Sequence, residues 1–320
     1  MGSLMAAPFV FGSDYGTTGL IDVPTARMAN DGYLTIGAAF DGLHQSYSVT
    51  YQALPWLETT FRYTGFEDFF FWDRNYAIKA RLWEESRFLP QVSVGARDIV
   101  GTGVFGSEYV VASKQMGNLD LTMGVGWGRL AGEGQFGNPL SVLDDSFDIR
   151  PVARGLGDTG NVRNVFFRGE EASIFGGASY QFSQWPLKLI AEYNPDQYDF
   201  NNRGSRPEFR PSTEISYGIE WNVTEGVNIS LTHQHNDNIG ISIRSVLDSK
   251  ALPPQPNKPQ FVSSIYLPQS RLPGQINKKS WYDRLLYDVE RSGLLLVEGN
   301  LSNDGSSVEL VVGNTKYSLW

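Results

Sequence analysis

Apolar and polar residues alternate in short runs along most of the chain, which is the period-two pattern of β-strands. In "YAIKARLW", residues 76–83, Ile78 and Leu82 fall on one face while Lys79 and Arg81 fall on the other. Twelve such runs occur, each about seven to ten residues long, near the length that a tilted strand needs to cross a bilayer. They span residues 33–41, 46–53, 58–64, 76–83, 91–98, 108–114, 119–127, 173–182, 187–194, 213–222, 227–234 and 239–246.

Alternation alone does not show whether the apolar or the polar face of a strand points to the outside of the molecule. A soluble β-sandwich or small barrel therefore stays an alternative to a membrane barrel. Three features favour the membrane: the high strand count, the alternation of short connections with longer ones, and aromatic residues near the ends of the apolar faces. These aromatic residues are Tyr33, Tyr47, Trp83, Trp127, Tyr180, Phe182, Tyr193 and Trp221. The pattern therefore predicts an all-β membrane protein, an antiparallel transmembrane β-barrel of about twelve strands.

Four regions follow from this pattern. Residues 1–31 are expected to form a periplasmic lead-in or plug segment, and residues 32–247 the outer-membrane barrel. Residues 248–277 are proline-rich and read as a linker. Residues 278–320, with a helical pattern in "SWYDRLLYDVERSG" and two strand-like runs after it, predict a small α/β periplasmic segment that looks incomplete. With an even number of strands, and the first strand rising from the periplasm, both chain ends are expected in the periplasm.

Composition narrows the function classes. The net charge is -9 and the pI about 4.9, which argues against a nucleic-acid partner. The chain has no cysteine, so disulfides and thiolate metal sites are excluded. There is no apolar run long enough for a transmembrane helix, and the first residues do not have the pattern of a signal peptide.

Several stretches carry a family resemblance. They include "GLIDVPTARMANDGYL", "PWLETTFRYT", "KARLWEESRFLPQVSVGARDIVGTGVFGSEYVVASK", "LDLTMGVGWGRL", "ASIFGGASYQ" and "PLKLIAEYN". Together they resemble the YjbH/GfcD family of outer-membrane proteins, which are encoded with exopolysaccharide and capsule genes in Gram-negative bacteria. The resemblance covers about residues 16–246 and implies an outer-membrane barrel for exopolysaccharide synthesis, secretion or display. Family members are typically longer, with a second barrel, so this chain resembles the N-terminal part or a short form of such a protein. The resemblance implies no catalytic residues for this chain.

Charged residues on the polar strand faces are expected to line the barrel lumen. One interpretation is a charged path for a polyanionic glycan, and the other is ion pairing that fills a closed barrel. A twelve-strand barrel is narrow, which favours a plugged or partly filled interior. The candidates are Arg62, Lys79, Arg81, Arg97, Lys114, Lys188, Glu192, Glu214, Glu220 and Arg244.

Two predicted external loops offer candidate glycan contacts. "FEDFFFWDR" places Phe69, Phe70, Phe71 and Trp72 in one loop, where they would either stack on sugar rings or cap the barrel mouth. The connection at residues 128–172 carries Arg150 and Arg154, which would either bind acidic polysaccharide or lipopolysaccharide phosphate or pair within a folded-in loop. The segment "GLIDVPTARM" before the first strand is either a plug threading the lumen or an ordinary ordered lead-in.

Catalytic chemistry has little support in the sequence. His233 and His235 are too few for a metal site, and no nucleophile elbow is present, so we expect no catalytic residue, metal or cofactor. The expected function is non-enzymatic participation in exopolysaccharide or capsule export or assembly. The alternatives are a scaffold barrel that docks periplasmic partners without conducting glycan, and a soluble β-rich glycan-binding protein. Expected partners are outer-membrane lipid or lipopolysaccharide, an exopolysaccharide, and periplasmic proteins of the export pathway.

Overall fold

The chain forms two separate compact units, Met1–Leu252 and Pro253–Trp320. The computed structural model describes residues 12–66, 69–151, 165–198, 210–235, 238–251, 285–286, 288–289, 294–304 and 306–314. Among these residues, no helix is long and apolar enough to cross a membrane.

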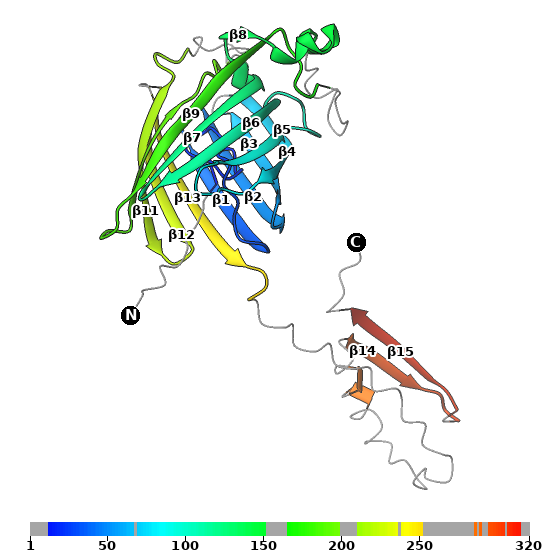
Figure 1. Ribbon diagram of the computed structural model, residues 1–320. Helices are drawn as coiled ribbons and strands as arrows, with labels where there is room; N and C mark the ends of the chain where they lie inside the picture. The colour runs from blue at the N-terminus through cyan, green and yellow to red at the C-terminus, as the bar shows by residue number, and fades with distance from the viewer. Residues whose placement is uncertain are drawn as a thin grey trace. The chain divides into compact units, whose positions relative to one another are not determined.

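The first unit is a closed antiparallel barrel of twelve strands (Figure 1). Strands adjacent in the chain pair with each other, and β1 pairs with β13 to close the ring. The twelve-strand barrel that the alternation predicts is therefore confirmed, and each predicted run corresponds to one strand. The barrel strands are β1 (Tyr33–Phe40), β2 (His44–Leu54), β3 (Leu57–Phe66), β4 (Phe69–Trp83), β5 (Gln91–Arg97), β6 (Ser107–Met116), β7 (Leu119–Gly128), β9 (Glu171–Gln181), β10 (Leu187–Tyr193), β11 (Ile215–Thr224), β12 (Val227–Gln234) and β13 (Asn238–Asp248).

The two ends of the barrel differ. At one end, which we call the turn end, short connections join the strands, and β1 begins and β13 ends there. At the other, the loop end, lie the long connections of residues 129–170 and 194–214. The first of these contains the short strand β8 (Phe136–Gly137), which pairs with β9, and three 3-10 turns, η1 (Arg129–Ala131), η2 (Pro139–Val142) and η3 (Asp145–Asp148).

The barrel is apolar outside and polar inside. On β4, Ile78 and Leu82 are 37% and 54% exposed, whereas Asp73 and Lys79 are fully buried. The same alternation runs around the ring, because paired residues in adjacent strands share a face. A soluble barrel would bury the opposite set, so the outer surface is one that hydrocarbon would cover.

One predicted loop is instead part of the sheet. β3 continues to Phe66 and β4 starts at Phe69, so "FFFW" at residues 69–72 belongs to a strand and the loop prediction is wrong. The aromatic residues prolong the β3–β4 ladder because rings pair well across strands: Trp72 stacks on Tyr63 with ring centroids 4.8 Å apart. The side chains of Phe69–Phe71 lie outside the described part of the chain.

The second unit is described mainly as a β-hairpin. Strands β14 (Leu294–Leu301) and β15 (Val308–Asn314) pair antiparallel. Four described residues before them, Leu285, Leu286, Asp288 and Val289, are helical, but the rest of the predicted helix and of the proline-rich linker lies outside the described residues. An α/β fold for residues 278–320 thus stays a prediction.

Candidate functional site

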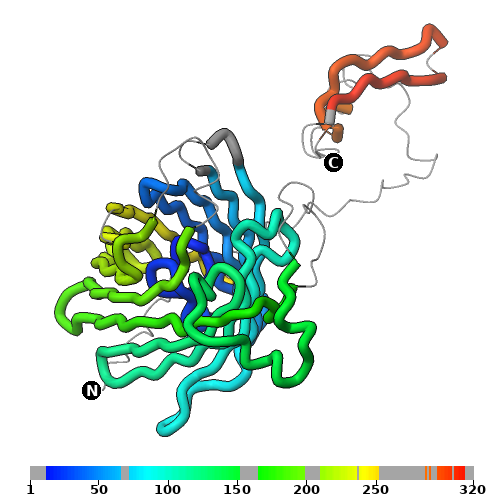
Figure 2. Tube along the Cα trace, turned by 90° about the horizontal axis from the view of Figure 1, so that it is seen from above, coloured from blue at the N-terminus to red at the C-terminus, as the bar shows by residue number. Residues whose placement is uncertain are grey.

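The lumen of the barrel contains the N-terminal segment of the same chain. Residues 12–28, which we call the plug, lie inside the ring of strands in both views (dark blue in Figures 1 and 2). The plug has no periodic pattern and no regular strand. It is held by its own short bridges and by contacts with the barrel wall and with the connections at the loop end. Of the two alternatives for "GLIDVPTARM", the structure shows the segment inside the lumen.

Glu192 on β10 holds the tip of the plug. Its carboxylate accepts backbone N–H groups from Ile21, Asp22 and Val23 at 2.9–3.1 Å. All four residues are buried. Three consecutive N–H groups that converge on one buried carboxylate make charge-assisted hydrogen bonds, which are stronger than neutral ones. Glu192 therefore fixes both the position and the backbone conformation of the plug tip.

Lys79 on β4 and Glu58 on β3 hold the next part of the plug. The Lys79 ammonium lies 3.2 Å from the Glu58 carboxylate and donates to the backbone carbonyls of Thr18 at 3.1 Å and Arg27 at 2.8 Å. Glu58 in turn accepts the backbone N–H of Thr18 at 3.0 Å and its hydroxyl. A buried ion pair is tolerated where further hydrogen bonds satisfy both partners, and here the plug backbone supplies them.

Further contacts anchor the two ends of the plug. Near the turn end, Arg27 forms a bidentate pair with Asp120 and a second ion pair with Glu85. Deeper inside, Asp14 pairs with Arg244 and accepts from Gln234. Side chains of nine barrel strands bind the plug, namely those of β2 to β7, β10, β12 and β13. The other residues that do so are Ser46, Thr50, Gln52, Gln91, Ser93, Arg97 and Ser113.

Arginine and aromatic side chains fill the lumen toward the loop end. The guanidinium of Arg62 lies 4.1 Å from the ring centre of Tyr15 and 4.4 Å from that of Phe105, and Arg97 lies 4.2 Å from Tyr15. Arg129 binds Asp196 at 2.8 Å. These cations are held against aromatic faces, a stabilising arrangement when water is excluded.

Apolar packing closes what remains of the lumen. Ile21, Val23 and Ala26 of the plug are buried with barrel residues that include Tyr109 and Phe175. Gly16 has a φ of +84°, and a Cβ there would lie 2.6 Å from Ser48, so only glycine lets the plug approach this wall. Within the described residues, the plug and the inward side chains thus occupy the lumen between the strands.

Nine of the ten predicted lumen residues divide into three groups. Arg62, Lys79, Arg97, Glu192 and Arg244 face inward and are buried among plug or wall residues. Arg81, Lys188 and Glu220 lie at inward positions near the turn end, where Lys188 pairs with Glu220 and Arg81 with the exposed Glu84. Glu214 precedes β11 and is half-buried, and its carbonyl accepts the N–H of Asn194 at 2.8 Å.

Lys114 differs from its prediction. Its register partner is Leu121, which is exposed, so Lys114 is at an outward position of β6 rather than in the lumen. At the turn-end rim its ammonium reaches Glu85 at 2.9 Å. The sequence does not distinguish the two faces of β6 because both mix apolar and polar residues, and Glu108 shares the outward face with Lys114.

The predicted external contacts are engaged within the protein. Arg150 pairs bidentately with Glu108 and donates to the carbonyls of Val165 and Arg168, so the loop-end connection folds back onto the barrel. Arg154 lies outside the described residues. Trp72 faces outward from β4 instead of standing in a loop.

His233 and His235 do not form a common site. The ring of His233 stacks on Tyr217 on the outer face, whereas His235 points inward and its Nε2 lies 2.8 Å from the Tyr198 hydroxyl. In the described ranges there is no group of three His, Asp or Glu side chains that could hold a metal. Tyr198 also donates to Asp22 at 2.6 Å, which ties the β10–β11 connection to the plug.

Sequence reasoning missed several plug contacts. Glu58 could have been found, because it shares the inward face of β3 with Arg62. Asp14, Asp22 and Tyr198 lie in segments without periodicity, and nothing in their surroundings marks them. In the connection between β5 and β6, burial and then the nearby Asp73 raise the pKa of Asp98 from 3.8 to about 7.

Comparison with known proteins finds a family match over most of the chain. Residues 12–320 match the family described as "Exopolysaccharide biosynthesis protein YbjH". The chain is 36% identical over 247 residues to the "Uncharacterized lipoprotein YjbH" of Escherichia coli (strain K12), covering 73% of this chain and 35% of that protein. The chain therefore spans about a third of the length of this relative.

Among solved structures, the KdgM porin is similar with a TM-score of 0.37 and 5% identity, over 67% of this chain and 97% of that one. The NanC porin has a TM-score of 0.35 and 8% identity, over 67% and 98%. TM-scores this low do not establish a shared fold; the strand pairing of the chain establishes its barrel. The extent of the family match and the identity to the relative show that the chain belongs to the YjbH exopolysaccharide biosynthesis family.

Proposed function

We propose that this chain is a non-enzymatic outer-membrane component of an exopolysaccharide pathway that acts as a closed anchoring barrel rather than as a glycan conduit. The observation that carries the proposal is the plug, which is hydrogen-bonded to nine barrel strands and leaves the lumen filled. Membership of the exopolysaccharide biosynthesis family supports a role of the chain in that pathway. Partners would then be periplasmic proteins of the pathway, docked near residues 248–320, with no nucleic acid involved.

The proposed location follows from the surface of the barrel. Most outward residues of the strands are apolar. Aromatic residues gather near the two rims, such as Tyr47 and Trp72 toward the loop end and Trp83 and Trp221 toward the turn end. Aromatic girdles flanking an apolar band are typical of barrels in the outer membrane. Short turns are typical of the periplasmic side, so we place the turn end and both chain ends in the periplasm, and the long connections outside.

A second candidate, export of the polymer through the lumen, is favoured by one observation. The inward cations Arg62, Lys79 and Arg97 would line a continuous path if the plug moved out, and a polyanionic exopolysaccharide would be attracted to them. Export therefore requires departure of the plug, whereas anchoring does not. A cross-link that holds the plug in the lumen would block export and leave anchoring intact.

The experiment locks the plug in place. The backbone N–H of Ala26 donates to Ser113 on β6 at 2.9 Å, so the pair Ala26→Cys and Ser113→Cys is close enough to test for a disulfide in the oxidising periplasm. The chain has no other cysteine, which keeps the cross-link unique. The double variant and each single variant are expressed in cells that lack the native gene, and secreted polysaccharide is measured.

Anchoring predicts that the locked variant restores polymer output as well as wild type does, with or without a reducing agent. Export predicts low output that a reducing agent restores, and that result would contradict the proposal. The single-cysteine variants control for the substitutions themselves. If the wild-type gene fails to restore output in the deletion strain, the proposed place in the pathway is wrong for either mechanism.

A further inference from the structure

One charged side chain on the outer face of the barrel, that of Arg74, has no ionic partner among the described residues. Arg74 lies on the outward face of β4, in line with Trp72, Tyr76 and Ile78, and it is exposed. The other charged residues at outward strand positions are paired, Lys114 with Glu85 and Glu108 with Arg150. Among the described residues Arg74 forms no ion pair. An unpaired cation on the lipid-facing surface is unfavourable unless an anion meets it there.

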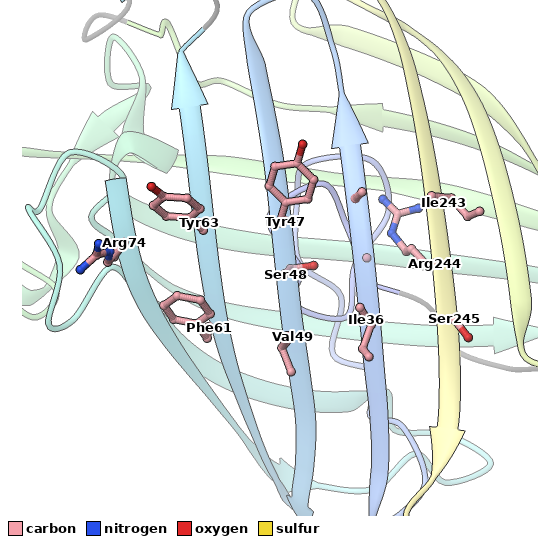
Figure 3. Close-up of a pocket in the computed structure, with 12 residues that line it drawn as sticks. Ile36, Tyr47, Ser48, Val49, Phe61, Tyr63, Arg74, Ile243, Arg244 and Ser245 are labelled. Atoms are coloured by element: carbon pink, nitrogen blue, oxygen red, sulfur yellow. The ribbon is translucent and has the colours of Figure 1, made fainter. Parts of the chain in front are cut away.

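A groove lies beside Arg74. One row of paired residues crosses five neighbouring strands. It consists of Arg74 on β4, Tyr63 on β3, Tyr47 on β2, Ala38 on β1 and Ile243 on β13. Ala38 is small, so the row is hollow between the large side chains around it (Figure 3). The groove has a volume of about 700 Å³, and its walls are mainly apolar, formed also by Ile36, Val49, Phe61 and the residues just named.

The groove is amphipathic. Its apolar part runs along Ile36, Val49 and Phe61, whereas Arg74 and the hydroxyls of Tyr47 and Tyr63 lie toward the loop end. In Figure 3 the Tyr47 hydroxyl points to the end at which β1 and β3 finish, and the Tyr63 hydroxyl points to the side on which Arg74 lies. The Arg74 guanidinium is 5.8 Å from the Tyr63 ring centre, a distance that leaves its donors available to another group.

We propose that this groove binds a lipid that carries a phosphate group, with an acyl chain along the apolar walls and the phosphate on Arg74. A guanidinium presents paired donors that match a phosphate, and the two tyrosine hydroxyls add donors at the same level. The occupant is a lipid rather than a free anion because most of the groove is apolar and offers nothing to a hydrated ion. The inference rests on the membrane location proposed above and is independent of the role in polysaccharide handling.

The test measures lipid retention by the purified protein in a neutral detergent. Phosphatidylglycerol and phosphatidylcholine with identical acyl chains are added, and bound lipid is counted by native mass spectrometry. We expect wild type to retain phosphatidylglycerol over phosphatidylcholine. Arg74→Gln should weaken phosphatidylglycerol binding by about fivefold, the effect of one arginine near an anionic headgroup. Arg87→Gln, which changes an exposed arginine in the β4–β5 turn, is the matched control and should change nothing.

A second variant tests the groove itself. Ala38→Leu fills the hollow and should reduce retention of both lipids, whereas Ala80→Leu, an outward position on β4 away from the groove, should not. Slower migration after boiling in a denaturing gel confirms that each variant is folded. Equal retention by wild type and Arg74→Gln, or no effect of Ala38→Leu, would overturn the proposal. Full displacement of the lipid by inorganic phosphate would overturn it too, by showing a free-anion site. None of these outcomes depends on polymer output, so failure here is distinct from failure of the proposed function.

Discussion

Replacing Glu192 with glutamine should release the plug without unfolding the barrel. The carboxylate now accepts three buried backbone N–H groups, from Ile21, Asp22 and Val23. Glutamine keeps one acceptor oxygen but turns an NH₂ donor toward N–H groups that need an acceptor. All three N–H groups reach the oxygen Oε2, so a glutamine oxygen in that place can still accept them. The Asp22 N–H then faces the new NH₂ instead of Oε1, and none of the three bonds is charge-assisted any longer. With hydrogen bonds to charged groups worth about 1.5–3 kcal/mol each, we expect the plug to lose about 2–4 kcal/mol of docking free energy.

Amide hydrogen exchange measures this loss directly. A decrease of about 2–4 kcal/mol in the free energy of local opening corresponds to exchange that is roughly 30- to 1000-fold faster at residues 21–23. Amides in the strands far from Glu192 should keep their protection. Glu220→Gln is the matched control, because Glu220 also faces inward but pairs with Lys188 and does not contact the plug in the described structure. Unchanged exchange at residues 21–23 in Glu192→Gln would refute the assignment of this carboxylate as the main anchor.

Three further predictions concern other buried contacts. Lys79→Met should lower the free energy of unfolding by about 3–5 kcal/mol, because it leaves Glu58 buried without its cation, and it should expose the plug to protease. Arg81→Met, whose partner Glu84 is exposed, should lower the free energy of unfolding by less than about 1 kcal/mol. Equal protease sensitivity of the two variants would contradict this ranking. Asn138→Ala removes side-chain hydrogen bonds to three loop carbonyls and the one that the Trp127 indole donates, so protease should cleave residues 139–170 faster. Asn118→Ala, in an exposed turn, is the control, and equal cleavage rates of the two variants would show that Asn138 does not anchor this connection. Because the pKa of Asp98 is raised from 3.8 to about 7 in the folded protein, the unfolded chain binds fewer protons between these values, and the stability contribution of Asp98 falls as pH rises through that window. Asp98→Asn should therefore flatten the decline of the thermal unfolding midpoint between pH 4 and 7, and an unchanged slope would show that Asp98 is not its source.

The barrel itself was predictable because its physical signal is repeated. Each strand must present apolar residues to one side and polar residues to the other, so period-two alternation appears twelve times and one ambiguous run changes little. β4 is the clearest case, with Lys79 and Ile78 on the predicted faces. β6 is the counterexample: Glu108 is covered by the loop-end connection and Lys114 is at the rim, so neither follows the rule for lipid-facing positions.

The plug was not predictable in the same way. Its residues are selected by individual contacts rather than by a repeating environment, and backbone groups rather than side chains form most of its hydrogen bonds. Any sequence can supply backbone N–H and C=O groups, so "GLIDVPTARM" carries no sign of Glu192 or Lys79 on the other side of the barrel. The inward charges were identifiable, but their partners were not, because the partners come from segments about 40 to 230 residues away in the chain.

Ion conductance of the purified protein in a planar lipid bilayer tests the central claim, that the plug closes the lumen. Wild type should insert without adding steady conductance, and Glu192→Gln should produce intermittent openings as the plug leaves the lumen. Glu220→Gln should behave as wild type. A steady, open-channel conductance from wild-type protein would contradict the account, because a lumen packed as described leaves no path for ions.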